Sequence, residues 1–193
     1  MSLLKNLLAL VGLAVMVGAG YGYSKLSPIL AEFDPGYMKI YTEFATSLLK
    51  TRDPGEAMMW AVPVEDPKLT VDEVKDSLKS LASARNFLFV GEAPFYKQVE
   101  AVTGQKSRHI AFLSFCDVMV GKMMADYRDA YTGFMPCRVA VVEDKSGKIW
   151  LYSMNLDMMI HGGRRLPEDL RKEALRIRNV IWEILQGAAK GEF

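Results

Sequence analysis

The sequence predicts an α+β protein with a small mixed or antiparallel sheet, helices packed on one of its faces, and a preceding N-terminal transmembrane helix. Three observations predict this architecture: an uninterrupted apolar segment near the N-terminus, an irregular succession of helix-like and strand-like segments, and a hairpin pattern late in the chain. Segments in such an order indicate helices layered on a mixed or antiparallel sheet rather than a doubly wound parallel sheet.

The composition is that of an ordinary globular protein and argues against one large class of function. The chain has 193 residues, 50% of them hydrophobic and 24% charged, which is enough for one domain with a core plus appendages. Its formal net charge is +1, and no five like charges follow one another. Nucleic-acid binding requires a clustered basic surface, so we expect no nucleic-acid partner.

The segment from Leu7 to Tyr23 contains only apolar residues and glycine, and it lies between Lys5 and Lys25. A transmembrane helix needs about 20 mostly apolar residues, a length that this segment reaches with its flanking leucines. We therefore expect residues 1–26 to be a transmembrane anchor. The alternative is a secretory signal cleaved near Gly20, although no A-x-A pattern is present.

The same segment predicts the location of the protein. The short N-terminal tail carries Lys5 and the amino group, and short positive tails stay in the cytoplasm. We expect a single-pass protein of the inner membrane whose soluble domain lies in the periplasm. If the segment is a cleaved signal, the mature chain is instead secreted to the periplasm.

Residues 27–56 are expected to form an amphipathic stalk helix between the anchor and the domain. Asp34 precedes Pro35, which is the pairing of an N-cap with proline at the first helical position. Apolar residues then recur at helical spacing to about residue 50, so this helix has one apolar face.

An α/β domain is expected over residues 57–160, followed by a separate C-terminal helix within residues 161–193. The clearest helix start is Thr70, because Glu73 completes a capping box. The clearest hairpin surrounds the turn that ends at Gly147. The expected strands are 57–64, 87–90, 109–115, 137–143 and 148–154, and the expected helices are 70–85, 94–102, 118–131 and 167–186.

Two cysteines form the most informative pair for function. Cys116 ends one expected strand and Cys137 begins another, so neighbouring strand ends would bring the two sulfurs together. Outside the cytoplasm, a disulfide is the expected state of such a pair. The alternatives are two buried free thiols, or a redox or metal-binding role.

Methionines supply a second source of sulfur. Among the 12 methionines, Met119, Met123, Met124 and Met135 surround the cysteines in sequence. Thiolate and thioether sulfurs suit copper(I) or haem iron, so haem or copper is the cofactor that this region would bind. The alternative is that Met119 and Met123, four residues apart, line the buried face of a helix.

A smaller cluster follows the last expected strand and contains Met158, Met159 and His161. Histidine with methionine can ligate haem or copper. The alternative is a loop that packs an apolar corner and turns the next arginines to solvent. The candidate metal ligands are therefore Cys116, Cys137, Met158, Met159 and His161.

Recognisable catalytic motifs do not occur in the sequence. It contains no G-x-S-x-G, P-loop, H-E-x-x-H or C-x-x-C pattern. We predict no catalytic residue and favour a non-enzymatic protein. The enzymatic alternative is a nucleophilic Cys116 thiolate, which a disulfide to Cys137 would remove.

About half of the chain follows a recognisable family pattern. Its elements are T-V-D-E-V at Thr70, a strand ending at Phe115-Cys116, and FMPCRVAVVED from Phe134 to Asp144, followed by GKIWL from Gly147. This pattern resembles the domain of unknown function 302 family, from about Met58 to Ile160. The resemblance implies a compact α/β domain, often dimeric, without established activity or catalytic residues. It is also similar to a branch of that family from bacteria that respire or oxidise sulfur compounds.

Together these observations predict a membrane-tethered extracytoplasmic binding or accessory subunit of a respiratory or sulfur-oxidation complex. The alternative is a small redox or haem- or copper-binding protein that uses Cys116, Cys137 and the nearby methionines. The expected partners are the membrane and either another protein or a second copy of this chain.

Overall fold

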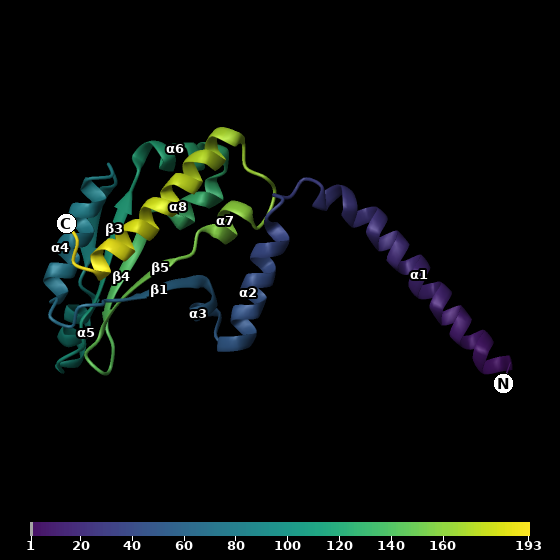
Figure 1. The fold of residues 1–193 in the computed structure, drawn as a ribbon, viewed down its shortest axis with the longest axis horizontal. Helices are drawn as coiled ribbons and strands as arrows, with labels where there is room; N and C mark the ends of the chain where they lie inside the picture. The colour runs from purple at the N-terminus through teal and green to yellow at the C-terminus, as the bar shows by residue number, and fades with distance from the viewer. Residues whose placement is uncertain (1) are drawn as a thin grey trace.

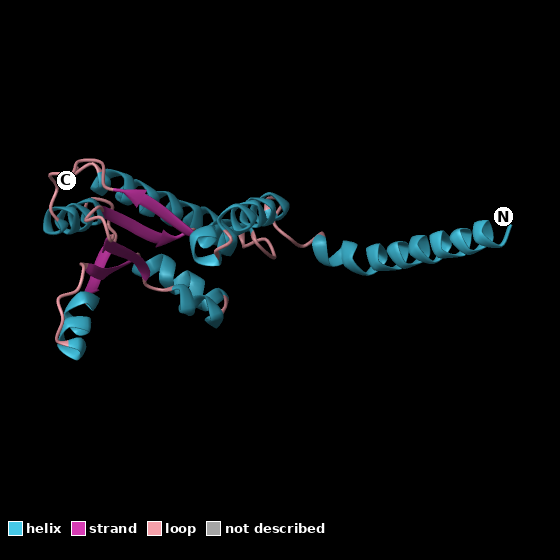
Figure 2. Cartoon of the chain, turned by 90° about the horizontal axis from the view of Figure 1, so that it is seen from below, coloured by secondary structure: helices cyan, strands magenta, loops and turns pink. Residues whose placement is uncertain are grey.

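A five-stranded antiparallel sheet forms the centre of the protein (Figures 1 and 2). The computed structural model describes residues 2–193. The strands are β1 (Met59–Pro63), β2 (Leu88–Ala93), β3 (Ile110–Cys116), β4 (Cys137–Glu143) and β5 (Ile149–Met154). Their order across the sheet is β1-β5-β4-β3-β2, so the hairpin of β4 and β5 lies in the interior and β1 pairs with β5. The predicted fold class is confirmed, and the sheet is fully antiparallel.

Helices, two of which cover one face of the sheet, occur before, between and after the strands. They are α1 (Ser2–Leu30), α2 (Tyr37–Thr51), α3 (Pro54–Met58), α4 (Val71–Ser83), α5 (Phe95–Thr103), α6 (Val118–Tyr127), the 3-10 helix η1 (Asp129–Phe134), α7 (Asp157–His161) and α8 (Glu168–Ala189).

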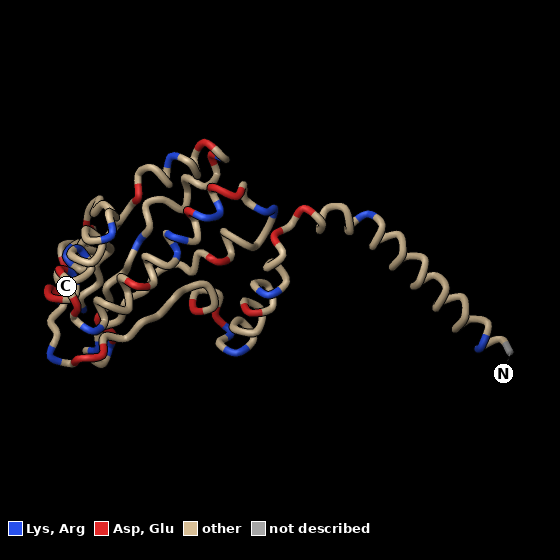
Figure 3. The backbone as a smooth tube through the Cα atoms, turned by 45° about the horizontal axis from the view of Figure 1, so that its top comes forward, with Lys and Arg blue, Asp and Glu red and all other residues tan. Residues whose placement is uncertain are grey.

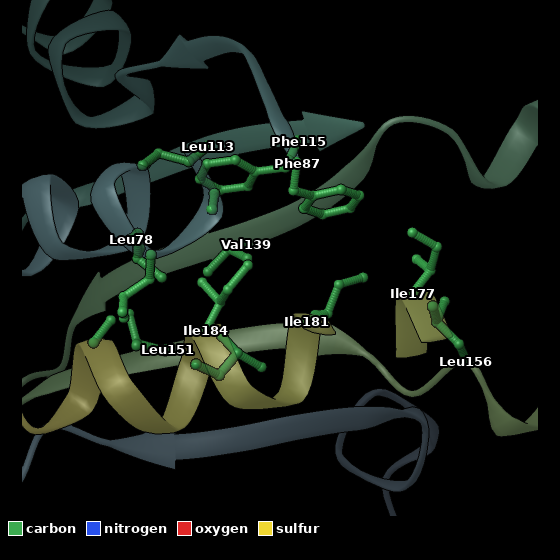
Figure 4. Close-up of a cluster of buried hydrophobic side chains, with 14 of the residues drawn as sticks. Leu78, Phe87, Leu113, Phe115, Val139, Leu151, Leu156, Ile177, Ile181 and Ile184 are labelled. Atoms are coloured by element: carbon green, nitrogen blue, oxygen red, sulfur yellow. The ribbon is translucent and has the colours of Figure 1, made fainter. Parts of the chain in front are cut away.

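The core lies between the sheet and the pair of helices α4 and α8, which pack side by side (Figure 1). Alternate residues of a strand point to opposite faces. Leu113 and Phe115 of β3 are therefore buried, whereas Phe112 and Ser114 point to the other face and stay partly exposed. The buried side chains of the sheet, α4 and α8 form one continuous cluster (Figure 4).

The C-terminal helix is part of this core. Its buried residues include Leu170, Ala174, Ile177, Ile181, Ile184 and Leu185. Trp182 also contacts Trp60 of β1, with ring centroids 5.2 Å apart. Helix α8 is thus a wall of the domain, whereas the sequence pattern placed it in a separate C-terminal segment.

Local side-chain bonds explain two element boundaries. The capping box of α4 is confirmed: the Glu73 amide donates to Thr70 Oγ1, and the Thr70 amide donates to Glu73 Oε2 at 2.7 Å. The expected strand 57–64 begins only at Met59, because Asp53 caps the short helix α3 by accepting a hydrogen bond from the Glu56 amide.

Helix α1 extends away from the rest of the protein (Figure 1). It is long and apolar enough to cross a membrane, and the window that meets this criterion has no residue buried within the protein. Figure 3 shows that its charged residues lie only near its two ends, where the sequence has Lys5 and Lys25. By length and composition alone, a signal sequence satisfies the same criterion.

Candidate functional site

A small cavity lined by five sulfur-containing side chains lies at the end of the sheet where β3 finishes and β4 begins. Its volume is about 50 Å³. The sulfur-containing residues, which we call the sulfur cluster, are Cys116, Met124, Met135, Cys137 and Met159. The rest of the wall is almost entirely apolar and includes Phe87, Val120, Phe134, Leu156, Ala174 and Ile177.

Gly121 of α6 provides the room beside two of these sulfurs. A Cβ atom at Gly121 would lie 3.1 Å from Met135 Sδ and 3.5 Å from Cys116 Sγ. Both sulfur atoms therefore face the same point on the helix. A side chain at this position would crowd Met135, because 3.1 Å is shorter than an ordinary van der Waals contact.

The two cysteines are free thiols, so the structure does not contain the expected disulfide. The register explains why they are not a cross-strand pair: Phe115, and not Cys116, lies opposite Cys137. Burial raises the pKa of the Cys137 thiol to about 12, with a further contribution from Cys116. Burial and the neighbouring Asp117 carboxylate also raise the pKa of Cys116. Neither environment activates a cysteine nucleophile.

Asp117 is the one charged residue in the cavity wall, and both of its carboxylate oxygens already accept hydrogen bonds. Its Oδ1 accepts hydrogen bonds from the Met119 and Val120 amides at the start of α6, and its Oδ2 accepts one from Arg176 Nη2 at 2.6 Å. Burial opposes ionisation of Asp117, but Arg176 and these amides outweigh it and lower the pKa. The carboxylate therefore stays ionised and tied to α8.

The candidate metal ligands do not all meet. Cys116, Cys137 and Met159 line the cavity, whereas Met158 and His161 are absent from its wall. Met158 packs against Gly162 instead. Among residues 2–193, no three His, Cys, Asp or Glu side chains are grouped so that they could hold a metal ion. Any metal site here depends on methionine. Of the four methionines that surround the cysteines in sequence, Met124 and Met135 line the cavity, whereas Met119 and Met123 do not.

His161 belongs to a second site, which we call the anchor clamp, formed with Asp34 and Arg171. Asp34 is only 1% exposed. Its Oδ1 lies 2.9 Å from His161 Nδ1 and accepts a hydrogen bond from the Gly36 amide, and its Oδ2 lies 3.1 Å from Arg171 Nε. Burial works to raise the pKa of Asp34, but the amide, His161 and Arg171 together hold it below its ordinary value.

Backbone contacts extend the clamp toward α1. The Asp34 amide donates to the Gly163 carbonyl at 2.9 Å, and the Arg165 amide donates to the Glu32 carbonyl at 3.0 Å. Phe33 and Arg164 form an isolated antiparallel bridge between these bonds. The chain is therefore fixed to the domain within a few residues of the end of α1.

A groove of about 400 Å³ lies between α2, α3 and α7. We call it the α2 groove. Apolar side chains on its wall include Ile40, Phe44, Met58, Met154, Met158 and Met159, and its acidic residues are Glu43, Glu56 and Asp157. Helix α2 has no fully buried residue, so the domain leaves much of its apolar side uncovered.

Comparison with known proteins identifies the family. The family model described as "Domain of unknown function DUF302" matches residues 61–188, more than half of the chain. The chain belongs to the DUF302 family. An uncharacterised conserved DUF302 protein from Bacillus stearothermophilus has a similar crystal structure, with a TM-score of 0.55 and 14% sequence identity over 67% of this chain and 96% of that one. No curated protein matches the sequence.

The sulfur-lined cavity lies within the DUF302 domain, whereas the anchor clamp joins His161 and Arg171 of that domain to the segment before it. Every residue that lines the sulfur-lined cavity lies within the matched range, whereas α1, α2 and Asp34 precede it. The DUF302 match also extends beyond Ile160 and includes most of α8, in agreement with the burial of that helix.

The cavity does not have the dimensions of a haem pocket. Sites for drug-sized ligands and cofactors have volumes of about 300–1,000 Å³. The cavity holds about 50 Å³, and His161, the histidine of the candidate ligand set, is bonded to Asp34 instead. The residues present therefore do not fit haem at this position.

Proposed function

We propose that this DUF302 protein is a membrane-tethered subunit whose domain stands on the extracytoplasmic side and binds a membrane protein through the α2 groove. The observation that carries the proposal is the short, fixed connection between α1 and the domain. A backbone bridge at Phe33 and the buried Asp34 follow directly after a helix that ends at Leu30. A domain held in this way stays beside the surface of the membrane that α1 would enter.

The position of the α2 groove favours a partner in the same membrane. Its first wall, α2, begins only seven residues after the end of α1. The groove combines exposed apolar surface with acidic side chains, and uncovered apolar patches mark interaction sites. A segment of a membrane protein just outside the bilayer would meet this groove without leaving the membrane surface.

The charged residues of the α2 groove indicate which side chains the bound segment of the partner would carry. Asp157 is neutralised by Arg178, which forms two bonds of 3.0 Å to it. Glu43 has only a loose, exposed partner in Lys39 at 3.7 Å, and Glu56 has no ion-pair partner within residues 2–193. Two acidic side chains thus remain for a partner, so the occupant we propose is an apolar segment with flanking basic residues.

Site-specific photo-crosslinking of the full-length protein in its native membranes tests this proposal. A photoreactive residue replaces Ser47, which lines the α2 groove, or Glu65, an exposed position beyond the other end of β1. We expect Ser47 to capture one membrane protein that Glu65 does not capture. Double reversal of Glu43 and Glu56 to lysine is expected to reduce that adduct at least several-fold.

Three results would contradict the proposal. They are the absence of an adduct at Ser47, identical adducts from both positions, or an adduct that survives the charge reversal undiminished. Glu65→Lys serves as the matched charge-reversal control and is expected to leave the Ser47 adduct unchanged.

A further inference from the structure

We propose that the sulfur cluster is a binding site for copper(I), with the Cys116 thiolate and the Met135 thioether as the principal ligands. Cys137, Met124 and Met159 complete the wall around the ion. This site goes beyond the partner-binding function, and its test does not depend on that function.

The chemistry of the wall selects the class of ligand. A buried water molecule needs two to four polar partners. The cavity is lined almost wholly by carbon and sulfur, and its one carboxylate, Asp117, is bonded to Arg176 and to two amides. Water is poorly held there, whereas a soft metal ion binds the sulfur atoms directly.

The volume of the cavity also favours a single metal ion as the ligand. A volume of about 50 Å³ is small for an organic ligand but ample for a single ion. Gly121 leaves the space between Met135 Sδ and Cys116 Sγ empty of side-chain atoms. An alanine at this position would place a methyl group where both sulfurs point.

Charge favours a monovalent ion over a divalent one. An uncompensated charge in an apolar environment is costly. One thiolate balances the single charge of copper(I), and thioethers are neutral, so the complex has no net charge. Binding replaces the Cys116 S–H bond with an S–Cu bond, the proton leaves to solvent, and the oxidation state of copper does not change.

Sulfurs outside the cavity provide an internal comparison. Met119 lies on the same helix as Gly121 and Met124, but its side chain is 69% exposed and does not line the cavity. Met158 faces the α2 groove and Gly162. A specific site therefore distinguishes Met135 from Met119, whereas nonspecific binding to surface methionines does not.

The test is titration of copper(I) into full-length protein in mild detergent without oxygen, in competition with a chromogenic copper(I) chelator. We expect one equivalent to bind, with Cys116→Ser and Met135→Leu each weakening affinity at least 10-fold and Met119→Leu leaving it unchanged. Gly121→Ala is expected to weaken copper(I) binding although every sulfur atom is kept.

Denaturant unfolding of each variant verifies the fold, and Met135→Leu conserves side-chain volume closely enough to keep the core intact. No bound copper(I), or equal affinity in the wild type, Cys116→Ser and Met135→Leu, would overturn the proposal.

Discussion

Asp34 is the side chain on which the fixed connection between α1 and the domain depends. A buried carboxylate is stable only when its charge is paired and its oxygens accept hydrogen bonds. Those contacts come from three separate segments: the Gly36 amide before α2, His161 at the end of α7, and Arg171 in α8. Loss of the carboxylate charge would leave Arg171 without its buried partner.

We predict that Asp34→Asn lowers the free energy of unfolding at pH 7 by about 3 kcal/mol, the cost of breaking a buried ion pair. The pKa of Asp34 is lowered in the folded protein, so its contribution is complete above the unfolded value of 3.8 and is lost as the pH falls through the folded value. The difference between wild type and variant should therefore disappear in strong acid. Denaturant unfolding of the full chain in detergent, followed by tryptophan fluorescence, measures it.

The control for this prediction is Asp66→Asn, at an exposed carboxylate that caps the Lys68 amide. We expect it to change stability by less than about 1 kcal/mol. Equal losses in the two variants, or a difference for Asp34→Asn that persists unchanged into strong acid, would argue against the anchor clamp.

The prediction that Asp34 is the N-cap of the helix was wrong: Gly36 occupies that position and α2 begins at Tyr37. The sequence also could not reveal the partners of Asp34. Its local pattern, Asp before Pro and Gly, predicts a turn into α2, and the Gly36 amide does bond to its side chain. His161 and Arg171 lie 127 and 137 residues away, and no local periodicity connects them with Asp34. Likewise, sequence proximity grouped His161 with Met158 and Met159. In the fold, Met159 lines the sulfur-lined cavity, His161 belongs to the anchor clamp, and Met158 faces the α2 groove.

At the scale of elements, the structure follows the local sequence rules at α4 and at the interior hairpin. Helix α4 begins at its capping box, and the interior hairpin turns at Gly147, whose φ of 85° favours glycine. The elements that the sequence missed are short: α3, which replaces the start of an expected strand, and α7, which was expected to be a loop. Their apolar residues occupy too few positions to distinguish a helical period from a strand period.

We predict that Thr70→Ala lowers the free energy of unfolding by about 1 kcal/mol, because the first turn of α4 loses its cap. Thr70 Oγ1 accepts the Glu73 amide hydrogen bond, and helix α4 packs on α8. Thr42→Ala is the matched control: Thr42 is exposed in the interior of α2 and bonds only to the carbonyl one turn earlier. There alanine is the better helix former, so we expect no loss of stability. Equal destabilisation by both substitutions would contradict a specific role for the capping box.

At the scale of the whole molecule, pairing between segments distant in the sequence determines which elements contact one another, and local sequence patterns do not predict these contacts. Strand β1 crosses to pair with β5, about 90 residues later, and α8 closes the core against α4. The sequence predicted both segments as elements without predicting their contacts. The sulfur cluster has the same origin, because α6, the start of β4 and α7 come together only when the sheet order is set.

The exposed apolar surface of α1 and the buried contacts of Asp34 predict opposite effects for two truncations. A chain of residues 27–193 loses most of α1, which extends away from the domain (Figure 1) and has no buried residue in its apolar window. It should therefore leave the membrane fraction and unfold within about 0.5 kcal/mol of the full chain. A chain of residues 37–193 also loses Asp34 and the bridge at Phe33, so we expect it to be about 3 kcal/mol less stable than the full chain.

Cell fractionation and denaturant unfolding of both chains measure these effects. Retention of residues 27–193 in the membrane would show that α1 is not the sole anchor, and equal stability of the two truncated chains would show that the clamp does not hold the segment after α1 to the domain.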